Sequence, residues 1–169
     1  GMPEPRDPAF VEAAIDQTRQ LLAVTSGRAF LLFTSFANLH ACHDGLKDKV
    51  AWPLLVQGEE PRHALLTRFR ETPNAVLLAT SSFWHGVDVQ GEALSQIAVA
   101  RLPFPVPSDP VYAGRAEQFD NPFDEFALPQ SVLRFRQGFG RLIRGSKERG
   151  VFVVLDSRVT RREYGPTFL

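Results

Sequence analysis

Cysteine is almost absent from this sequence, and long apolar runs are missing altogether. The single cysteine, Cys42, excludes an internal disulfide and is typical of proteins from a reducing compartment. No charged leader followed by an apolar segment is present, and no apolar run is long enough to span a bilayer. These absences predict a cytoplasmic protein without a membrane span. Gly1 ahead of Met2 is expected to be the remainder of an expression tag.

An excess of charge of either sign is also lacking. Nineteen lysine and arginine residues balance nineteen aspartate and glutamate residues. Net charge therefore gives no indication of nucleic-acid binding, and any such contact must come from locally placed side chains. With 169 residues, of which 44% are hydrophobic, the chain has the size and the apolar content of one compact domain.

Two parts of a complete ATP-hydrolysing site are missing. The sequence has no Gly-x-x-x-x-Gly-Lys-Ser/Thr loop, and Gly-Ser-Lys at 145–147 has neither that spacing nor a preceding strand. The acidic pair Asp124 and Glu125 follows a Pro-Phe dipeptide instead of ending an apolar strand, so we expect it to be solvated. A chain without a phosphate loop and a magnesium-binding carboxylate is not expected to turn over ATP by itself.

Strand-like and helix-like apolar patterns alternate along the chain. Continuous apolar runs predict five buried strands, at 29–33, 54–56, 75–79, 97–100 and 151–155. Helical spacing predicts helices at 8–25, 36–50, 62–70 and 132–143. This alternation favours an α/β fold in which helices cover both faces of a parallel sheet. The segment 103–129, rich in proline and aromatic residues, is expected to be an irregular excursion packed onto the domain.

The segment 137–145, Gln-Gly-Phe-Gly-Arg-Leu-Ile-Arg-Gly, carries the strongest functional pattern. On a helix, four of its residues share an arc about 100° wide, namely Gln137, Gly140, Arg141 and Arg144. Apolar residues fall on the opposite side and predict a buried face, although Leu133 breaks this division. Glycine inside a helix lowers helix stability by about 1 kcal/mol relative to alanine. The presence of Gly140 therefore indicates a packing or functional reason, such as the close approach of another surface. The alternative is an ordinary solvated face, the commoner setting of arginine.

These patterns resemble the motifs of superfamily 2 helicases, and in particular those of the DinG/XPD family. Gln-x-x-Gly-Arg-x-x-Arg at 137–144 is similar to motif VI, Thr-Ser-Ser-Phe-Trp-His-Gly-Val-Asp-Val-Gln-Gly at 80–91 to motif V, and Phe-Thr-Ser-Phe at 33–36 to motif IV. Shorter matches follow in family order at 57–58, 102–104, 156–158 and 164–165. The resemblance implies a RecA-like domain at 28–169, preceded by an N-terminal helix and leader at 1–27. Such a domain is the second motor domain of a DNA helicase, and it lacks the phosphate loop.

The resemblance also implies a role for individual residues. The residues expected at the catalytic centre are the arginine fingers Arg141 and Arg144, assisted by Gln137. Those expected against the nucleotide are Gly86, Asp88 and Gly140. Those expected on DNA are Thr34, Ser35, Thr80, Ser81 and Ser82. ATP and Mg²⁺ would be shared with a first RecA-like motor domain of the same parent chain, and single-stranded DNA would be the partner.

Several of these assignments have alternatives. The hydroxyls of motifs IV and V can equally cap turns or helices, and a helix that starts after motif IV can also offer its free N–H groups to phosphate. The family usually has glutamate where this sequence has His85. Because histidine titrates near neutral pH, the role of that position stays open.

Neither a metal site nor an iron–sulfur cluster is expected. His40 shares a helix face with His43 and Asp44, but structural zinc requires four ligands, usually including thiolates. An iron–sulfur cluster needs four cysteines, which this sequence does not have. The competing interpretation of the whole chain is a free-standing module that binds nucleic acid or protein without ATPase activity. A phosphate loop encoded upstream in the same reading frame would distinguish the two.

Overall fold

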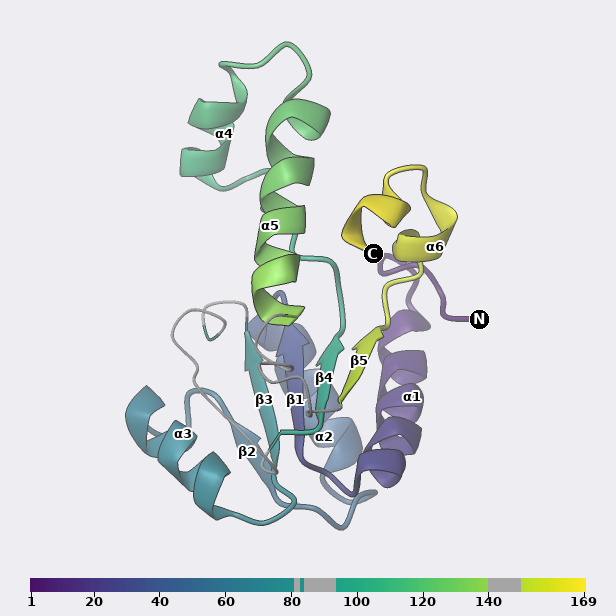
Figure 1. The fold of residues 1–169 in the computed structure, drawn as a ribbon, viewed down its shortest axis with the longest axis vertical. Coiled ribbons are helices and arrows are strands. Elements are labelled where there is room, and N and C mark those ends of the chain that lie inside the picture. Colours follow the sequence, from purple (N-terminus) through teal and green to yellow (C-terminus); the bar gives the residue numbers. More distant parts are fainter. Residues whose placement is uncertain (81–82, 84–93, 140–149) are drawn as a thin grey trace.

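A five-stranded parallel sheet forms the centre of the molecule (Figure 1). The computed structural model describes residues 1–80, 83, 94–139 and 150–169. Its strands are β1 (Ala29–Phe33), β2 (Leu54–Val56), β3 (Val76–Thr80), β4 (Gln96–Val99) and β5 (Val151–Val154). They are arranged in the order β2-β3-β1-β4-β5, and every neighbouring pair is parallel. The five predicted strands are confirmed, with boundaries that differ by at most one residue.

Helices cover both faces of the sheet, as predicted. The helices are α1 (Phe10–Thr25), α2 (Phe36–Leu46), α3 (Arg62–Glu71), α4 (Pro110–Ala116), α5 (Leu128–Phe139) and α6 (Arg158–Arg161). Helices α1 and α2 pack on one face through Leu22 and Leu39. Helices α3 and α5 reach the other face through Phe69 and Phe135. Within the described ranges, none of these helices has both the length and the apolar character needed to cross a membrane.

The sheet needs apolar side chains on both faces because helices bury both. In β1, Phe30 and Leu32 join the core under α3 and α5, whereas Leu31 and Phe33 join the core under α1 and α2. All five residues of β1 are buried. This two-sided burial explains why the strands appear in the sequence as continuous apolar runs and not as an alternating pattern.

The segment 103–129 is not the irregular excursion that its prolines predict. It contains α4, a π-helical turn (Phe123–Ala127) and the start of α5, which begins four residues before the predicted boundary. The Asp109 carboxylate accepts hydrogen bonds from the backbone N–H groups of Val111 (2.8 Å) and Tyr112 (3.3 Å). Pro110 stands in the first turn of α4, where a missing N–H costs nothing. Here proline therefore helps to start a helix.

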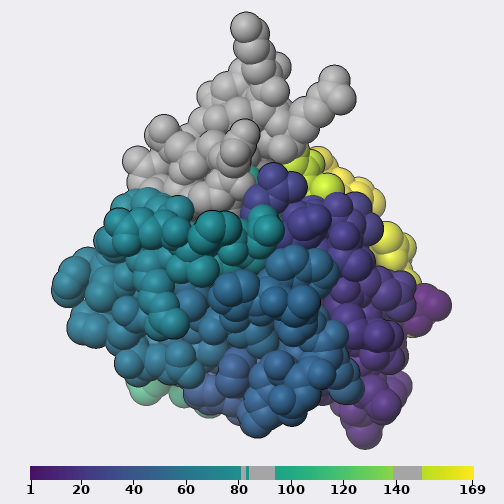
Figure 2. All heavy atoms as spheres, turned by 90° about the horizontal axis from the view of Figure 1, so that it is seen from below, coloured from purple at the N-terminus to yellow at the C-terminus, as the bar shows by residue number. Residues whose placement is uncertain are grey.

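Residues 110–134 form a helical arm that extends away from the sheet. Figure 1 shows α4 beside the first turns of α5, at the end of the molecule opposite to α3. Phe126 stacks on Phe119 at 5.3 Å and on Tyr112 at 5.6 Å, so the arm has an aromatic core of its own. Figure 2 views the molecule from the other end, where the segments from α2 to α3, coloured blue to teal, form much of the surface.

A buried carboxylate ties the root of the arm to β5. Asp156 follows β5 and is fully buried. One of its oxygens accepts hydrogen bonds from the Leu102 N–H at 2.9 Å and from Nη2 of Arg158 at 2.6 Å. Burial lowers the pKa of Arg158, but the hydrogen bonds and the charge of Asp156 outweigh burial and raise it above its usual value. These hydrogen bonds hold the segment after β4 against the segment after β5.

Candidate functional site

The carboxyl ends of the strands meet at one edge of the sheet, and the described motif residues gather there. Thr34 and Ser35 follow β1 directly, and Thr80 is the last residue of β3. The two strands are neighbours, with Phe33 in register with Thr80. Ligands of open α/β sheets bind beyond this edge, so motifs IV and V start where a ligand is expected.

Ser35 caps the helix that follows motif IV. Its backbone is extended, and its hydroxyl accepts a hydrogen bond from the Asn38 N–H at 3.3 Å. The capping interpretation is therefore confirmed for Ser35. Thr34 is half-buried, and its side chain lines a cavity beside the arm. Contact of either residue with DNA stays a prediction.

Thr80 is held by a side chain from the neighbouring strand. Its N–H (2.7 Å) and its hydroxyl (3.0 Å) both donate to Oε1 of Gln57, which follows β2. Thr80 is also buried. This double hydrogen bond fixes the start of motif V, and it is a role for the Thr80 hydroxyl that the sequence did not indicate.

Phe83 of motif V shares one core cluster with the helix that leads into motif VI. Phe83 of motif V is 4% exposed, and Phe135, two residues before motif VI, is 3% exposed. Both belong to the cluster that covers the same face of the sheet. Gln137, at the start of motif VI, is exposed, and so is Leu133. The predicted division of the helix into a buried and an exposed face is thus confirmed over the described residues, with Leu133 on the exposed side.

The other predicted site residues lie outside the described residues. They are Ser81, Ser82, Gly86, Asp88, Gly140, Arg141 and Arg144. His85 of motif V also lies outside them.

The side chains around Cys42 are engaged in contacts of their own. Cys42 is buried, and burial raises the pKa of its thiol to about 12, so it is not a thiolate at neutral pH. His40 stacks on Phe36 at 6.1 Å. Asp44 accepts a hydrogen bond from Lys47 at 3.1 Å, which lowers the pKa of Asp44. In the part of the chain that the structure describes, no three His, Cys, Asp or Glu residues are grouped to hold a metal ion. Asp124 and Glu125 are both exposed, as predicted for a solvated pair.

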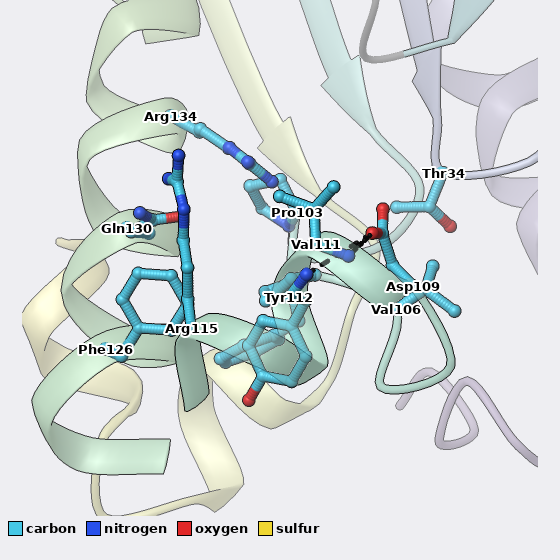
Figure 3. A pocket seen from close by; sticks show the side chains of 12 residues that line it. Thr34, Pro103, Val106, Asp109, Val111, Tyr112, Arg115, Phe126, Gln130 and Arg134 are labelled. Carbon is cyan, nitrogen blue, oxygen red and sulfur yellow. Dashed lines mark hydrogen bonds between the residues drawn. The ribbon is translucent and has the colours of Figure 1, made fainter. Parts of the chain in front are cut away.

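The structure also assembles a pocket that the sequence did not predict. A cavity of about 230 Å³ lies between α4, α5 and Thr34 (Figure 3). We call it the arm pocket and define it by Thr34, Phe104, Tyr112, Arg115, Phe126 and Arg134. The sequence signal was a segment rich in aromatic residues, with arginines at positions 115 and 134. Only the fold brings that segment next to motif IV.

Comparisons with known proteins agree with this arrangement. Residues 18–169 match the family described as the helicase C-terminal domain. The chain is 40% identical over 172 residues to the ATP-dependent DNA helicase YoaA of Escherichia coli (strain K12), a match that covers 99% of this chain and 27% of YoaA. It is 34% identical over 167 residues to the ATP-dependent helicase DinG of Mycobacterium tuberculosis (strain ATCC 25618 / H37Rv), covering 96% of this chain and 25% of DinG.

The chain thus spans about a quarter of the length of these curated relatives. Among solved structures, an XPD helicase superimposes with a TM-score of 0.75 at 15% identity, over 96% of this chain and 30% of that one. This likeness confirms the expected RecA-like fold. Because the family match covers nearly the whole sequence, the chain belongs to the helicase C-terminal domain family.

Proposed function

We propose that this chain is the second motor domain of an ATP-dependent DNA helicase. In this role it closes on a first RecA-like domain of the same parent protein, completes the ATP site between them and holds single-stranded DNA across both. The relatives YoaA and DinG are ATP-dependent helicases by name, which supports the proposal.

The observation that carries the proposal is the shared anchoring of motif V and of α5, the helix that leads into motif VI. Phe83 and Phe135 pack in one cluster, and Gln137 leaves that cluster on the exposed side of α5. A helix anchored in this way holds its exposed face in a fixed place relative to the carboxyl edge of the sheet. A fixed surface of that kind is what a site completed by a second domain requires, because its groups must be positioned before the reaction begins.

Each predicted residue then has a part in the reaction. Arg141 and Arg144 stabilise the negative charge that develops on the γ-phosphoryl group during transfer, and Gln137 assists them. Gly86, Asp88 and Gly140 lie against the nucleotide. The Mg²⁺ that accompanies ATP is held by the first domain and by the phosphates.

The test is the ATPase activity of the full-length protein with Arg141→Ala or Arg144→Ala. Arginine fingers contribute on the order of 10³-fold or more to turnover, so each variant should lose at least that factor in DNA-stimulated turnover. Lysine at either position should rescue little, because a point charge does not reproduce the planar guanidinium fork.

Arg136→Ala is the matched control, since Arg136 is an exposed arginine of α5 that precedes the motif. It should retain turnover, and all three alanine variants should melt within about 0.5 kcal/mol of the unchanged protein, as most surface substitutions do. Near-normal turnover in both Arg141→Ala and Arg144→Ala would refute the arginine-finger assignment and favour a solvated helix face.

A further inference from the structure

The connection between β2 and α3 contacts motif V at two places. It spans residues 57–61 and leaves the sheet beside the start of motif V, because β2 and β3 are neighbours. At its first residue, Gln57 accepts the two hydrogen bonds from Thr80. At its far end stands Arg62, the first residue of α3, which contacts Phe83. Motif V is therefore held at positions 80 and 83 by one short piece of chain.

Arg62 contacts Phe83 through both its charge and its hydrogen-bonding capacity. Its Nη2 donates to the Phe83 carbonyl oxygen at 3.4 Å, and its guanidinium carbon lies 5.0 Å from the centre of the Phe83 ring. A cation above an aromatic face is attracted by the negative face of the ring. The ring is buried in the core cluster that also contains Phe135. Arg62 thus joins the exposed surface of α3 to a core residue of motif V.

The stability of α3 does not explain an arginine at this position. The N-terminus of a helix is the positive end of its dipole, where acidic side chains are favourable and basic ones are not. The first turn of α3 has no acidic residue, and Pro61 at the N-cap position makes no side-chain capping hydrogen bond. Arg62 therefore works against the start of its own helix, and the contact with Phe83 supplies the compensating interaction.

The connection itself is restrained along its length. Gly58 has a φ of 104°, a conformation that favours glycine. Glu60 pairs at 3.0 Å with Arg68, which lies further along α3. Pro61 has a fixed φ immediately before α3 begins. A connection restrained in these three ways keeps its two ends in a constant relation to each other, so its two contacts with motif V act together.

We propose that Arg62 is a positioning residue that prepares motif V for single-stranded DNA. Thr80 and Phe83 are the held residues, and the hydroxyls expected on DNA, those of Ser81 and Ser82, lie between them in the sequence. A short segment fixed at both ends has few conformations, so less conformational entropy is lost when DNA binds. The effect on DNA rests on the proposed function, whereas the effect on motif V does not.

The first test is amide hydrogen exchange of the full-length protein without DNA or ATP. Arg62→Ala should raise the exchange rate in a peptide covering residues 80–91 by roughly 2- to 10-fold, as for the loss of one net hydrogen bond. Peptides from β1 and β4 should exchange as before. His63→Ala is the matched control, because His63 is the next exposed residue in the same turn of α3. It should leave the exchange of motif V unchanged.

The second test is the ATPase rate of the full-length protein, titrated with an oligothymidine strand. Arg62→Ala should raise the DNA concentration for half-maximal stimulation by roughly 10-fold or more, the effect of losing one hydrogen bond to a charged group. The maximal rate should fall much less, because Arg62 does not contact the γ-phosphoryl group. Arg62→Lys keeps a cation that can lie over the ring, so it should need less DNA than Arg62→Met, which keeps only the length of the side chain.

Three outcomes would overturn the proposal. Unchanged exchange in Arg62→Ala would mean that motif V is held without this residue. Faster exchange with an unchanged DNA titration would mean that the contact serves stability alone. Equal titrations for Arg62→Lys and Arg62→Met would mean that the cation is not responsible. Failure of the proposed function has a different signature, since the unsubstituted full-length protein would then show no stimulation by DNA, while hydrogen exchange would still report on Arg62.

Discussion

At the scale of single residues, the ion pair between Asp156 and Arg158 is expected to contribute to stability because Asp156 is buried. Asp156 has no exposed surface, and it accepts hydrogen bonds from Nε and Nη2 of Arg158. Removal of one partner from a buried pair leaves an uncompensated charge. Arg158→Ala should therefore lower the free energy of unfolding by about 3 kcal/mol. Urea denaturation followed by circular dichroism measures this loss.

Arg162→Ala provides the comparison from the same part of the chain. Arg162 pairs with Glu4 at 3.0 Å, but the two side chains are 51% and 40% exposed. Exposed pairs of this kind contribute about 0–1 kcal/mol, so this variant should unfold close to the unchanged protein. Equal losses for Arg158→Ala and Arg162→Ala would show that burial of Asp156 does not control the stability of the pair.

At the scale of elements, the lack of a side chain on Gly165 allows the C-terminal turn to lie close to α6. Gly165 begins a 3-10 turn (Gly165–Phe168), and a Cβ on it would lie 2.2 Å from the carbonyl oxygen of Val159. Backbone atoms cannot move aside as the end of a side chain can. Gly165→Ala should therefore lower the free energy of unfolding by about 1–3 kcal/mol, the usual penalty of overpacking. Thermal melting measures this loss of stability.

Gly114→Ala is the matched control for this substitution. Gly114 lies in α4, and a Cβ there would meet no atom within 4 Å. Alanine in an open helical position should stabilise the protein by roughly 0.5–1 kcal/mol. The two glycines thus predict changes of opposite sign, and a loss of stability in both variants would contradict the steric explanation.

The sequence predicted helices and strands well where the burial pattern of neighbouring residues alone determines the element. Apolar runs predicted the strands because burial on both faces favours apolar residues along most of their length. The helix α4 was missed because prolines between 103 and 110 were taken to break structure. Asp109 followed by Pro110 was in fact a start signal, with a capping carboxylate and a proline in the first turn.

At the scale of the whole molecule, the site contacts that the sequence could not predict are those between residues far apart in the chain. The cap at Ser35 was predictable because its partner, Asn38, is three residues away. The hydrogen bonds from Thr80 to Gln57 were not, because these residues meet only when β2 and β3 become neighbours. The arm pocket was missed for the same reason, since Thr34 and Arg134 are brought together only by the fold.

The proposed division of the ATP site between two domains leads to the last prediction, which concerns the 169-residue chain by itself. The sequence lacks a phosphate loop, and hydrolysis requires groups that hold the β- and γ-phosphates together with Mg²⁺. Arginine fingers lower the barrier only for a γ-phosphoryl group that is already in place. The purified chain should therefore show no magnesium-dependent ATPase above the buffer rate, with or without single-stranded DNA, while the full-length protein shows DNA-stimulated turnover under the same conditions. Phosphate release measured on both preparations decides the matter. Turnover that copurifies with the 169-residue chain and survives Arg141→Ala would mean that the site is not shared between two domains.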